Sequence, residues 1–310
     1  MKNTNPTDKP GMKKATMIIF AGQNSFMTYK ELEFRVIDAI SGLYGQNEAR
    51  SVQRFLFACF SGFDPAGYLL KRNEEADEDF ENKIILAIPR LIEFEPVQYI
   101  TGKTWFCGTE LSVRPGVLIP RPETENLVMK IVEKHKSREG ISILDIGTGS
   151  GAIAISLYLL IGTARIEAID ISEVALSIAK ENADENRAVV GFSQIDILDR
   201  KASEKLPFFN VIVSNPPYIR QSEKSLMKRN VLDFEPETAL FVENSDPLIY
   251  YRAIAGFALS HLEPGGELWF EINESEGENL QILLKNLGFR HIEIIPDLNS
   301  KPRYAFAQIQ

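Results

Sequence analysis

From Ile141 to its C-terminus, the chain alternates short apolar runs with segments of helical periodicity, and this alternation restricts the fold more than any other feature. We predict strands at 141–146, 165–170, 190–195, 210–214, 266–272, 290–295 and 303–309. Predicted helices lie between most of them, at 123–136, 151–161, 173–186, 246–262 and 274–287. Such alternation is typical of a mostly parallel, doubly wound sheet. Residues 121–310 are therefore expected to form a Rossmann-like, seven-stranded α/β domain.

The region before residue 96 has helical periodicity instead. Thr28 and Glu31 fit a capping box at a helix start. The apolar residues predicted on one face of that helix are Leu32, Val36, Ile40 and Leu43. Further helices are predicted at 48–60, from Asp64-Pro65 onward, and at 77–94. Residues 27–95 are therefore expected to form a small, all-helical N-terminal domain.

Two segments flank this helical domain. Residues 1–26 are rich in Asn, Thr, Pro and Lys, show no sustained period and are expected to be a loose leader. They lack the apolar core and cleavage site of a signal peptide. In residues 96–120, short β-type runs alternate with Gly and Pro, which predicts a β-hairpin linker to the α/β domain.

Composition excludes several classes of protein. A net charge of −9 and a pI of about 5.1 argue against nucleic-acid binding by broad phosphate neutralisation. One stretch, Arg220, Lys224, Lys228 and Arg229, is either a local basic patch or a solvated loop. No run of about 18 apolar residues predicts a membrane span. Cys59 and Cys107 have no disulfide or zinc spacing, so we expect no metal and a cytoplasmic location.

The first predicted strand ends in a glycine-rich turn that opens a helix. The turn reads Asp145-Ile-Gly147-Thr148-Gly149-Ser150-Gly151. Glycines let the backbone turn sharply and approach a ligand at a helix N-terminus. The same residues satisfy a loose dinucleotide-binding pattern, and a tight turn without a ligand is the alternative.

Acidic residues follow the next two strands. Asp170 ends the second strand, where a carboxylate can accept the ribose hydroxyls of an adenosine, or cap the next helix before Glu173. Asp196-Ile197 follows the third strand and either contacts an adenine or belongs to an ordinary loop. NAD and S-adenosyl-L-methionine both carry that ribose, so these residues do not separate the two.

Asn215-Pro216-Pro217-Tyr218 ends the fourth strand, at the same edge of the sheet. Two prolines fix the backbone around the Asn and the Tyr. The Asn215 side-chain oxygen and a proline carbonyl can accept both hydrogens of a planar NH2 group, and Tyr218 can pack against it. Such acceptors raise the electron density at a delocalised nitrogen, which favours methyl transfer to an amide or an aromatic amine.

With these motifs, the sequence resembles the class I amino-methyltransferases that use S-adenosyl-L-methionine. The NPPY members of that class modify adenine or cytosine in DNA, or glutamine in proteins. Further stretches narrow the resemblance over about residues 28–310 to the release factor glutamine methyltransferases (PrmC or HemK). They are PVQYITG (96–102), FCG (106–108), VLIPRPETENLV (117–128), FEP (234–236) and AL (239–240).

The resemblance implies methylation of the glutamine side-chain amide in the GGQ motif of peptide chain release factors, leaving S-adenosyl-L-homocysteine. It implies cofactor contacts at Gly147–Gly151, Asp170, Ile197 and Asn215, although some relatives have an aromatic residue where Ile197 stands. Asn215 to Tyr218 would hold the glutamine, with Asn215, Pro216 and Tyr218 as the catalytic residues. The helical domain would recognise the release factor. The residues implied near the cofactor pocket are Arg121, Glu123, Thr124 and Glu125.

The resemblance has two departures. The chain reads Glu271-Ile-Asn273-Glu-Ser-Glu276 where many relatives continue Glu-Ile with a glycine, and its leader before Met27 is longer than usual. Two other functions remain as alternatives. One is a DNA adenine or cytosine amino-methyltransferase, which usually needs a target-recognition domain and a basic surface. The other is a non-catalytic, cofactor-binding assembly partner. An NAD oxidoreductase lacks support beyond the glycine turn. We expect a monomer with no nucleic-acid or membrane partner.

Overall fold

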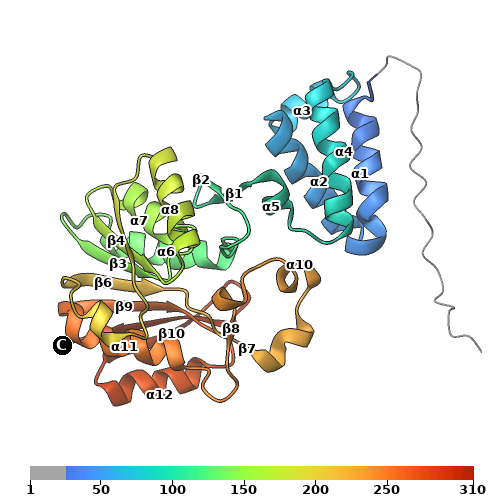
Figure 1. Cartoon of the computed structure of the whole chain (residues 1–310). Coiled ribbons are helices and arrows are strands. Elements are labelled where there is room, and N and C mark those ends of the chain that lie inside the picture. The colour runs from blue at the N-terminus through green and yellow to red at the C-terminus, as the bar shows by residue number, and fades with distance from the viewer. Residues whose placement is uncertain (1–25) are drawn as a thin grey trace, which may run out of the picture.

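A computed structural model describes residues 26–310, in which a helical lobe is joined to a larger α/β lobe (Figure 1). The leader predicted at 1–26 therefore lies outside the described residues, apart from Phe26. The helices of the first lobe are α1 (Tyr29–Tyr44), α2 (Gln46–Ser61), the short α3 (Pro65–Lys71) and α4 (Glu78–Ile92). Thr28 and Glu31 form the predicted capping box at the start of α1.

The prediction of the apolar face of α1 was wrong for one residue, Leu43. Leu32, Val36 and Ile40 are fully buried, but Leu43 is 47% exposed. Each step of four residues turns the buried stripe by about 40° around an α-helix. The stripe therefore continues at Tyr44, whose hydroxyl donates to the Leu91 carbonyl of α4 at 2.8 Å, and leaves Leu43 outside.

The linker begins as a helix, which the sequence prediction of a β-hairpin linker at 96–120 did not include. Its elements are α5 (Val97–Thr101), β1 (Lys103–Phe106) and β2 (Thr109–Ser112). Pro96 accepts the first helical hydrogen bonds, and Gly102, in the left-handed region, ends α5. The predicted hairpin follows, with β1 and β2 antiparallel. Its Ser112 exchanges two hydrogen bonds with Asn182, which fastens the hairpin to the α/β lobe.

The α/β lobe contains a seven-stranded sheet in the order β10-β11-β9-β6-β3-β4-β5. Only β11 runs against its neighbours. The strands are β3 (Ser142–Ile146), β4 (Arg165–Asp170), β5 (Val190–Gln194), β6 (Phe209–Ser214), β9 (Leu262–Glu271), β10 (Arg290–Pro296) and β11 (Pro302–Gln308). This confirms the predicted α/β class.

Helices cover both faces of the sheet (Figure 1). The helices on one face are α6 (Pro122–His135), α7 (Ala152–Ile161) and α8 (Glu173–Glu185), and those on the other are α11 (Ile249–His261) and α12 (Gly277–Leu287). A short α9 (Arg200–Ser203) precedes β6. All five residues of β3 are buried, because β3 lies at the centre of the sheet with helices on both sides.

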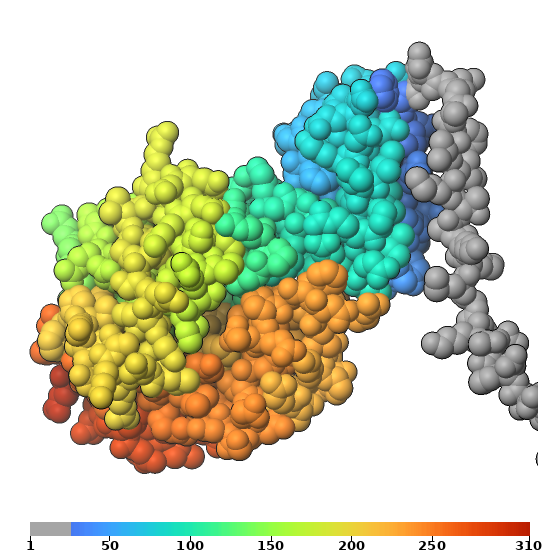
Figure 2. All heavy atoms as spheres, in the orientation of Figure 1, coloured from blue at the N-terminus to red at the C-terminus, as the bar shows by residue number. Residues whose placement is uncertain are grey.

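Residues 219–242 form short elements that the sequence did not predict. They are β7 (Ile219–Arg220), η1 (Gln221–Leu226), α10 (Arg229–Leu232), η2 (Glu237–Ala239) and β8 (Phe241–Val242). Figure 2 shows this orange segment reaching the helical lobe. There the Lys228 ammonium pairs with Glu48 of α2 at 3.0 Å, and the Arg229 guanidinium lies 4.6 Å from the centre of the Phe94 ring.

Within residues 26–310, no helix is long and apolar enough to cross a membrane. In the same range, no three His, Cys, Asp or Glu side chains gather as a metal site would require.

Candidate functional site

A cavity of about 170 Å³ opens at the carboxyl edge of the sheet. It lies where β3 and β6 end and the chain connections turn to opposite sides of the sheet, which is the usual place for a ligand in this topology. Five of the predicted cofactor residues line it: Gly147, Gly149, Asp170, Ile197 and Asn215. The fold therefore brings together residues from the ends of four strands.

The other three predicted cofactor residues do not line this cavity. The side chain of Thr148 turns inward, and its hydroxyl donates to Asp145 Oδ2 at 2.7 Å. The carbonyl of Ser150 accepts a hydrogen bond from Asn182 of α8. Gly151 stands at the N-cap of α7 with φ at 82°, where a side chain would meet Ile155 and α8. These residues build the turn that presents Gly147 and Gly149.

Asp170 is held by the glycine turn itself. Its Oδ2 accepts the Gly149 amide and its Oδ1 accepts the Ser172 amide, both at 2.9 Å. The alternative role as a helix cap is wrong, because Ser172 caps α8 and accepts from Ala175. Burial raises the pKa of Asp170. Each carboxylate oxygen keeps a second acceptor site, so Asp170 can still take ribose hydroxyls.

Asp145 carries an unpaired oxygen beneath the glycine turn. The residue is fully buried, and its Oδ1 has no hydrogen-bond partner among the described residues. Burial raises the pKa of Asp145 to about 7. A buried acidic oxygen without a donor suits a positively charged group nearby. S-adenosyl-L-methionine carries an ammonium and a sulfonium, so this site fits that group.

A second cavity of about 260 Å³ lies against the first. The two share the lining residues Leu118, Asn215, Pro216 and Ala239. Tyr218 and Glu271 line only the second cavity. Asn215 and Pro216 therefore form a wall that both cavities share, so ligands in the two spaces would meet beside it.

The side-chain amide of Asn215 is tied on one side only. Its Nδ2 donates to Thr124 Oγ1 at 3.2 Å. Among the described residues, no donor is bonded to Asn215 Oδ1 or to the Pro216 carbonyl. These are the two acceptors that the sequence predicted for a planar NH2 group.

Tyr218 is anchored at both its ring and its backbone. Its hydroxyl donates to Glu271 Oε1 at 3.1 Å, and burial raises its pKa. Its carbonyl accepts Asn273 Nδ2 at 3.3 Å, and the same Nδ2 approaches Glu223. The departure at Asn273 thus supplies a donor that holds the loop after Tyr218.

The residues of the PRPETE stretch lie around the second cavity and α6. Arg121 lines that cavity and pairs with the buried Glu235 at 2.5 Å. Thr124 contacts Asn215, whereas Glu125 accepts the Cys107 amide and the Glu123 carbonyl accepts the Tyr304 hydroxyl. None of the four lines the first cavity.

The basic stretch after Tyr218 is not an open patch of unpaired cations, although the side chains of Lys228 and Arg229 remain 71% and 59% exposed. Its four side chains are ion-paired with acids in both lobes: Arg220 with Glu276, Lys224 with Glu237, Lys228 with Glu48 and Arg229 with Asp233. Paired cations are poorly disposed to neutralise phosphates. This arrangement gives no support to a DNA substrate.

Comparisons with known proteins match both lobes. The family model of the methyltransferase small domain matches residues 123–233, and that of the PrmC N-terminal domain matches residues 39–102. The release factor glutamine methyltransferase of Bacteroides thetaiotaomicron is 39% identical over 86% of this chain and 94% of its own length. Those of Flavobacterium psychrophilum and Enterococcus faecalis are 35% and 36% identical, each over 89% of this chain and 98% of theirs.

The chain belongs to the release factor glutamine methyltransferase family. This membership confirms the family expected from NPPY and PRPETE, and with it a methyltransferase of the class I fold. The model of the PrmC N-terminal domain covers much of the helical lobe and ends at the start of the linker.

Several residues of this family member's site were missed from sequence. Gly116 and Val117, which precede α6, line the first cavity, as do Thr238 and Tyr250. Tyr250 lines the same cavity as Ile197, so an aromatic ring from α11 is present although residue 197 is not aromatic. The only sequence signal near Gly116 was the resemblance of residues 117–128 to the family. No local sequence pattern indicated Tyr250.

Proposed function

We propose that this protein methylates the side-chain amide nitrogen of the glutamine in the GGQ motif of peptide chain release factors. The supporting observation is the wall of Asn215 and Pro216 between two cavities, with both acceptors unbonded. A glutamine amide presents a planar NH2 group that those acceptors fit. Relatives named release factor glutamine methyltransferase support this substrate.

Each residue of the wall has a proposed role. Asn215 Oδ1 and the Pro216 carbonyl accept the two N–H groups of the glutamine amide, which raises electron density at its nitrogen. Tyr218, fixed by Glu271 and Asn273, packs against the amide plane. Gly147, Gly149, Asp170 and Ile197 line the other space, which is proposed to hold the cofactor. Holding both reactants in line supplies several kcal/mol of the required acceleration.

Bound S-adenosyl-L-methionine supplies a methyl group on a sulfonium and leaves as S-adenosyl-L-homocysteine. The glutamine nitrogen, held by Asn215 and Pro216, uses its lone pair for the new N–C bond, while the C–S bond electrons stay on sulfur. The nitrogen then loses one of its two protons to water. Because that proton leaves after transfer, the site needs no strong general base.

The test is transfer of labelled methyl from S-adenosyl-L-methionine to a purified release factor. The controls are the same factor with its GGQ glutamine replaced by alanine, and duplex DNA. We expect label only on the intact factor. Label on DNA, or label that survives loss of the glutamine, would overturn the proposed substrate. Asn215→Ala should lower kcat by about 10²–10³-fold while the Kd for the cofactor changes little.

We also propose that residues 27–95 form a substrate-recognition domain and that the linker at 96–120 sets its distance from the site. Support comes from the exposed side chains of Arg50 and Arg54, which have no ion-pair partner among the described residues. Arg50→Ala with Arg54→Ala should raise KM for the release factor about threefold to tenfold and leave kcat unchanged. An unchanged KM would count against this role. We expect the protein to act as a cytoplasmic monomer.

A further inference from the structure

Glu271 is a buried carboxylate between the substrate cavity and α6. It ends β9, where Ser214 of the neighbouring β6 pairs with Phe270, and it is 2% exposed. Its Oε2 accepts the Thr124 hydroxyl at 2.6 Å, and its Oε1 accepts the Tyr218 hydroxyl at 3.1 Å. One carboxylate thus takes a hydrogen bond from each side of Asn215.

The direction of these hydrogen bonds fixes the amide of Asn215. An ionised carboxylate can only accept, so the single hydroxyl proton of Thr124 points to Glu271. The Thr124 oxygen can then only accept from Asn215, and it receives Nδ2 at 3.2 Å. The oxygen and the nitrogen of an amide point in different directions from its carbon. Because Nδ2 faces Thr124, Oδ1 must face away from Thr124, toward the cavity.

We propose that Glu271 and Thr124 are positioning residues that hold the Asn215 amide in one of its two orientations, with Oδ1 toward the nitrogen to be methylated. This inference rests on the proposed function. The reversed amide would present Nδ2 to the substrate NH2, so two donors would meet and the acceptor would be lost. Nothing in the local sequence of NPPY fixes this orientation, because Thr124 and Glu271 lie far away in the chain.

The charge state of Glu271 is set by groups from several elements. Burial raises its pKa, the hydroxyls of Thr124 and Tyr218 lower it, Arg303 of β11 lowers it and Glu123 of α6 raises it. Tyr251 of α11 donates to the Glu271 backbone carbonyl and not to its carboxylate. A protonated Glu271 can donate to Thr124, which frees the Thr124 proton for Asn215 Oδ1 and permits the reversed amide.

The experiment compares Glu271→Gln and Thr124→Val with the matched control Thr124→Ser, which keeps the hydroxyl. Glu271→Gln and Thr124→Val should each lower kcat for release factor methylation by about 10–100-fold. Cofactor Kd, measured by calorimetry, should stay at the wild-type value and report that each variant is folded. Thr124→Ser should restore most of the lost kcat.

The pH profile distinguishes positioning from packing. In the wild type, kcat should fall as pH drops through the pKa of Glu271. In Thr124→Val this acid limb should disappear, because protonation of Glu271 no longer reaches Asn215. Wild-type kcat and an unchanged acid limb in both variants would overturn the inference.

The inference and the proposed function fail in different ways. If Asn215→Ala abolishes transfer while Thr124→Val and Glu271→Gln behave as wild type, only the positioning role is lost. If Asn215→Ala keeps full activity, the clamp itself is wrong. A Thr124→Ser variant as slow as Thr124→Val would assign the defect to packing and would also overturn the inference.

Discussion

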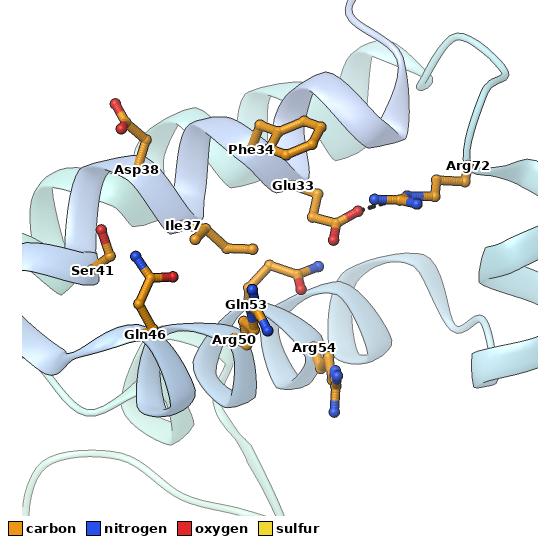
Figure 3. A pocket seen from close by; sticks show the side chains of 10 residues that line it. All are labelled: Glu33, Phe34, Ile37, Asp38, Ser41, Gln46, Arg50, Gln53, Arg54 and Arg72. Carbon is orange, nitrogen blue, oxygen red and sulfur yellow. Dashed lines mark hydrogen bonds and ion pairs between the residues drawn. The ribbon is translucent and has the colours of Figure 1, made fainter.

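The groove between α1 and α2 of the helical lobe and the cavity at the sheet edge differ in how their polar groups are held. The groove between α1 and α2 has a volume of about 530 Å³, about three times that of the cavity at the sheet edge (Figure 3). Among the side chains that line it, Figure 3 marks one interaction, the ion pair between Glu33 and Arg72. In the cavity at the sheet edge, Asp170 and Asn215 each have defined hydrogen-bond partners.

This comparison shows that the volume of a cavity does not by itself identify the site of catalysis. Catalysis needs polar groups that are already oriented, because they then need no reorganisation when charge develops. The sheet edge provides this through strand ends fixed by a buried sheet. The groove offers long, exposed side chains, which adapt to a partner and contribute mainly to encounter and specificity.

A large effect on cofactor binding is expected for Asp170→Ala at the sheet edge. Losing the carboxylate that holds the Gly149 amide and is proposed to bind the ribose should raise the cofactor Kd by about 10–100-fold. Arg54→Ala in the groove is the matched control and should leave that Kd unchanged. Calorimetric titration with the cofactor measures both. If both variants changed the cofactor Kd equally, the proposed difference between the groove and the cavity at the sheet edge would be wrong.

Two glycines with nearly the same backbone angles test how tightly each lobe is packed. Gly151 at the sheet edge has φ 82° and ψ 7°, and Gly62 at the end of α2 has φ 68° and ψ 8°. A Cβ at Gly62 meets nothing within 4 Å, whereas one at Gly151 lies 2.9 Å from Ile155 Cδ1 and 3.2 Å from Ala179 Cβ.

Gly62→Ala should therefore lower the free energy of unfolding by about 1 kcal/mol, the cost of the left-handed conformation alone. Gly151→Ala should lower it by about 3 kcal/mol, because crowding adds to that cost. Urea unfolding followed by circular dichroism measures both. A smaller loss at Gly151 than at Gly62 would contradict the packing argument.

The pH dependence of stability should come from Asp145. Its pKa is about 7 in the folded protein against 3.8 in the unfolded chain. Between these values the folded state keeps a proton that the unfolded state has released, so stability falls as pH rises from about 4 to about 7. The melting temperature of the cofactor-free protein should drop by several degrees over this range. In Asp145→Asn the decrease in melting temperature over this pH range should be smaller. If it is unchanged, the pH dependence of stability comes from other titratable groups.

The sequence predicted the parts of the site that are local in the chain. Apolar runs located all seven strands of the large sheet, since strands covered by helices are rich in apolar residues. The residues at or just after a strand end are Gly147, Gly149, Asp170 and Asn215, so the known geometry of parallel sheets places them at one edge. Element ends were less predictable, as with α12, which begins at Gly277 and not at 274.

The parts that depend on long-range contacts could not be predicted. Thr124 and Glu271 meet although 147 positions separate them. The basic residues after Tyr218 looked solvated or free for phosphates, because two of their acidic partners, Glu276 and Glu48, lie far away in the chain, and Glu48 lies on the other lobe. Hydrogen-bond direction around Asn215 likewise depends on the tertiary structure, since an isolated amide has no preferred orientation.

The smallest effect is expected for the ion pair that joins the two compared regions. Lys228 lies beyond the substrate cavity and Glu48 lies on α2, and their side chains are 71% and 42% exposed. Water and salt screen a pair this exposed, so a double-mutant cycle of Lys228→Ala and Glu48→Ala should give a coupling energy below about 1 kcal/mol. The coupling should also weaken at about 1 M salt. A coupling above about 2 kcal/mol that survives salt would mean that the segment after Tyr218 depends on the helical lobe, and the two regions would then act as one site.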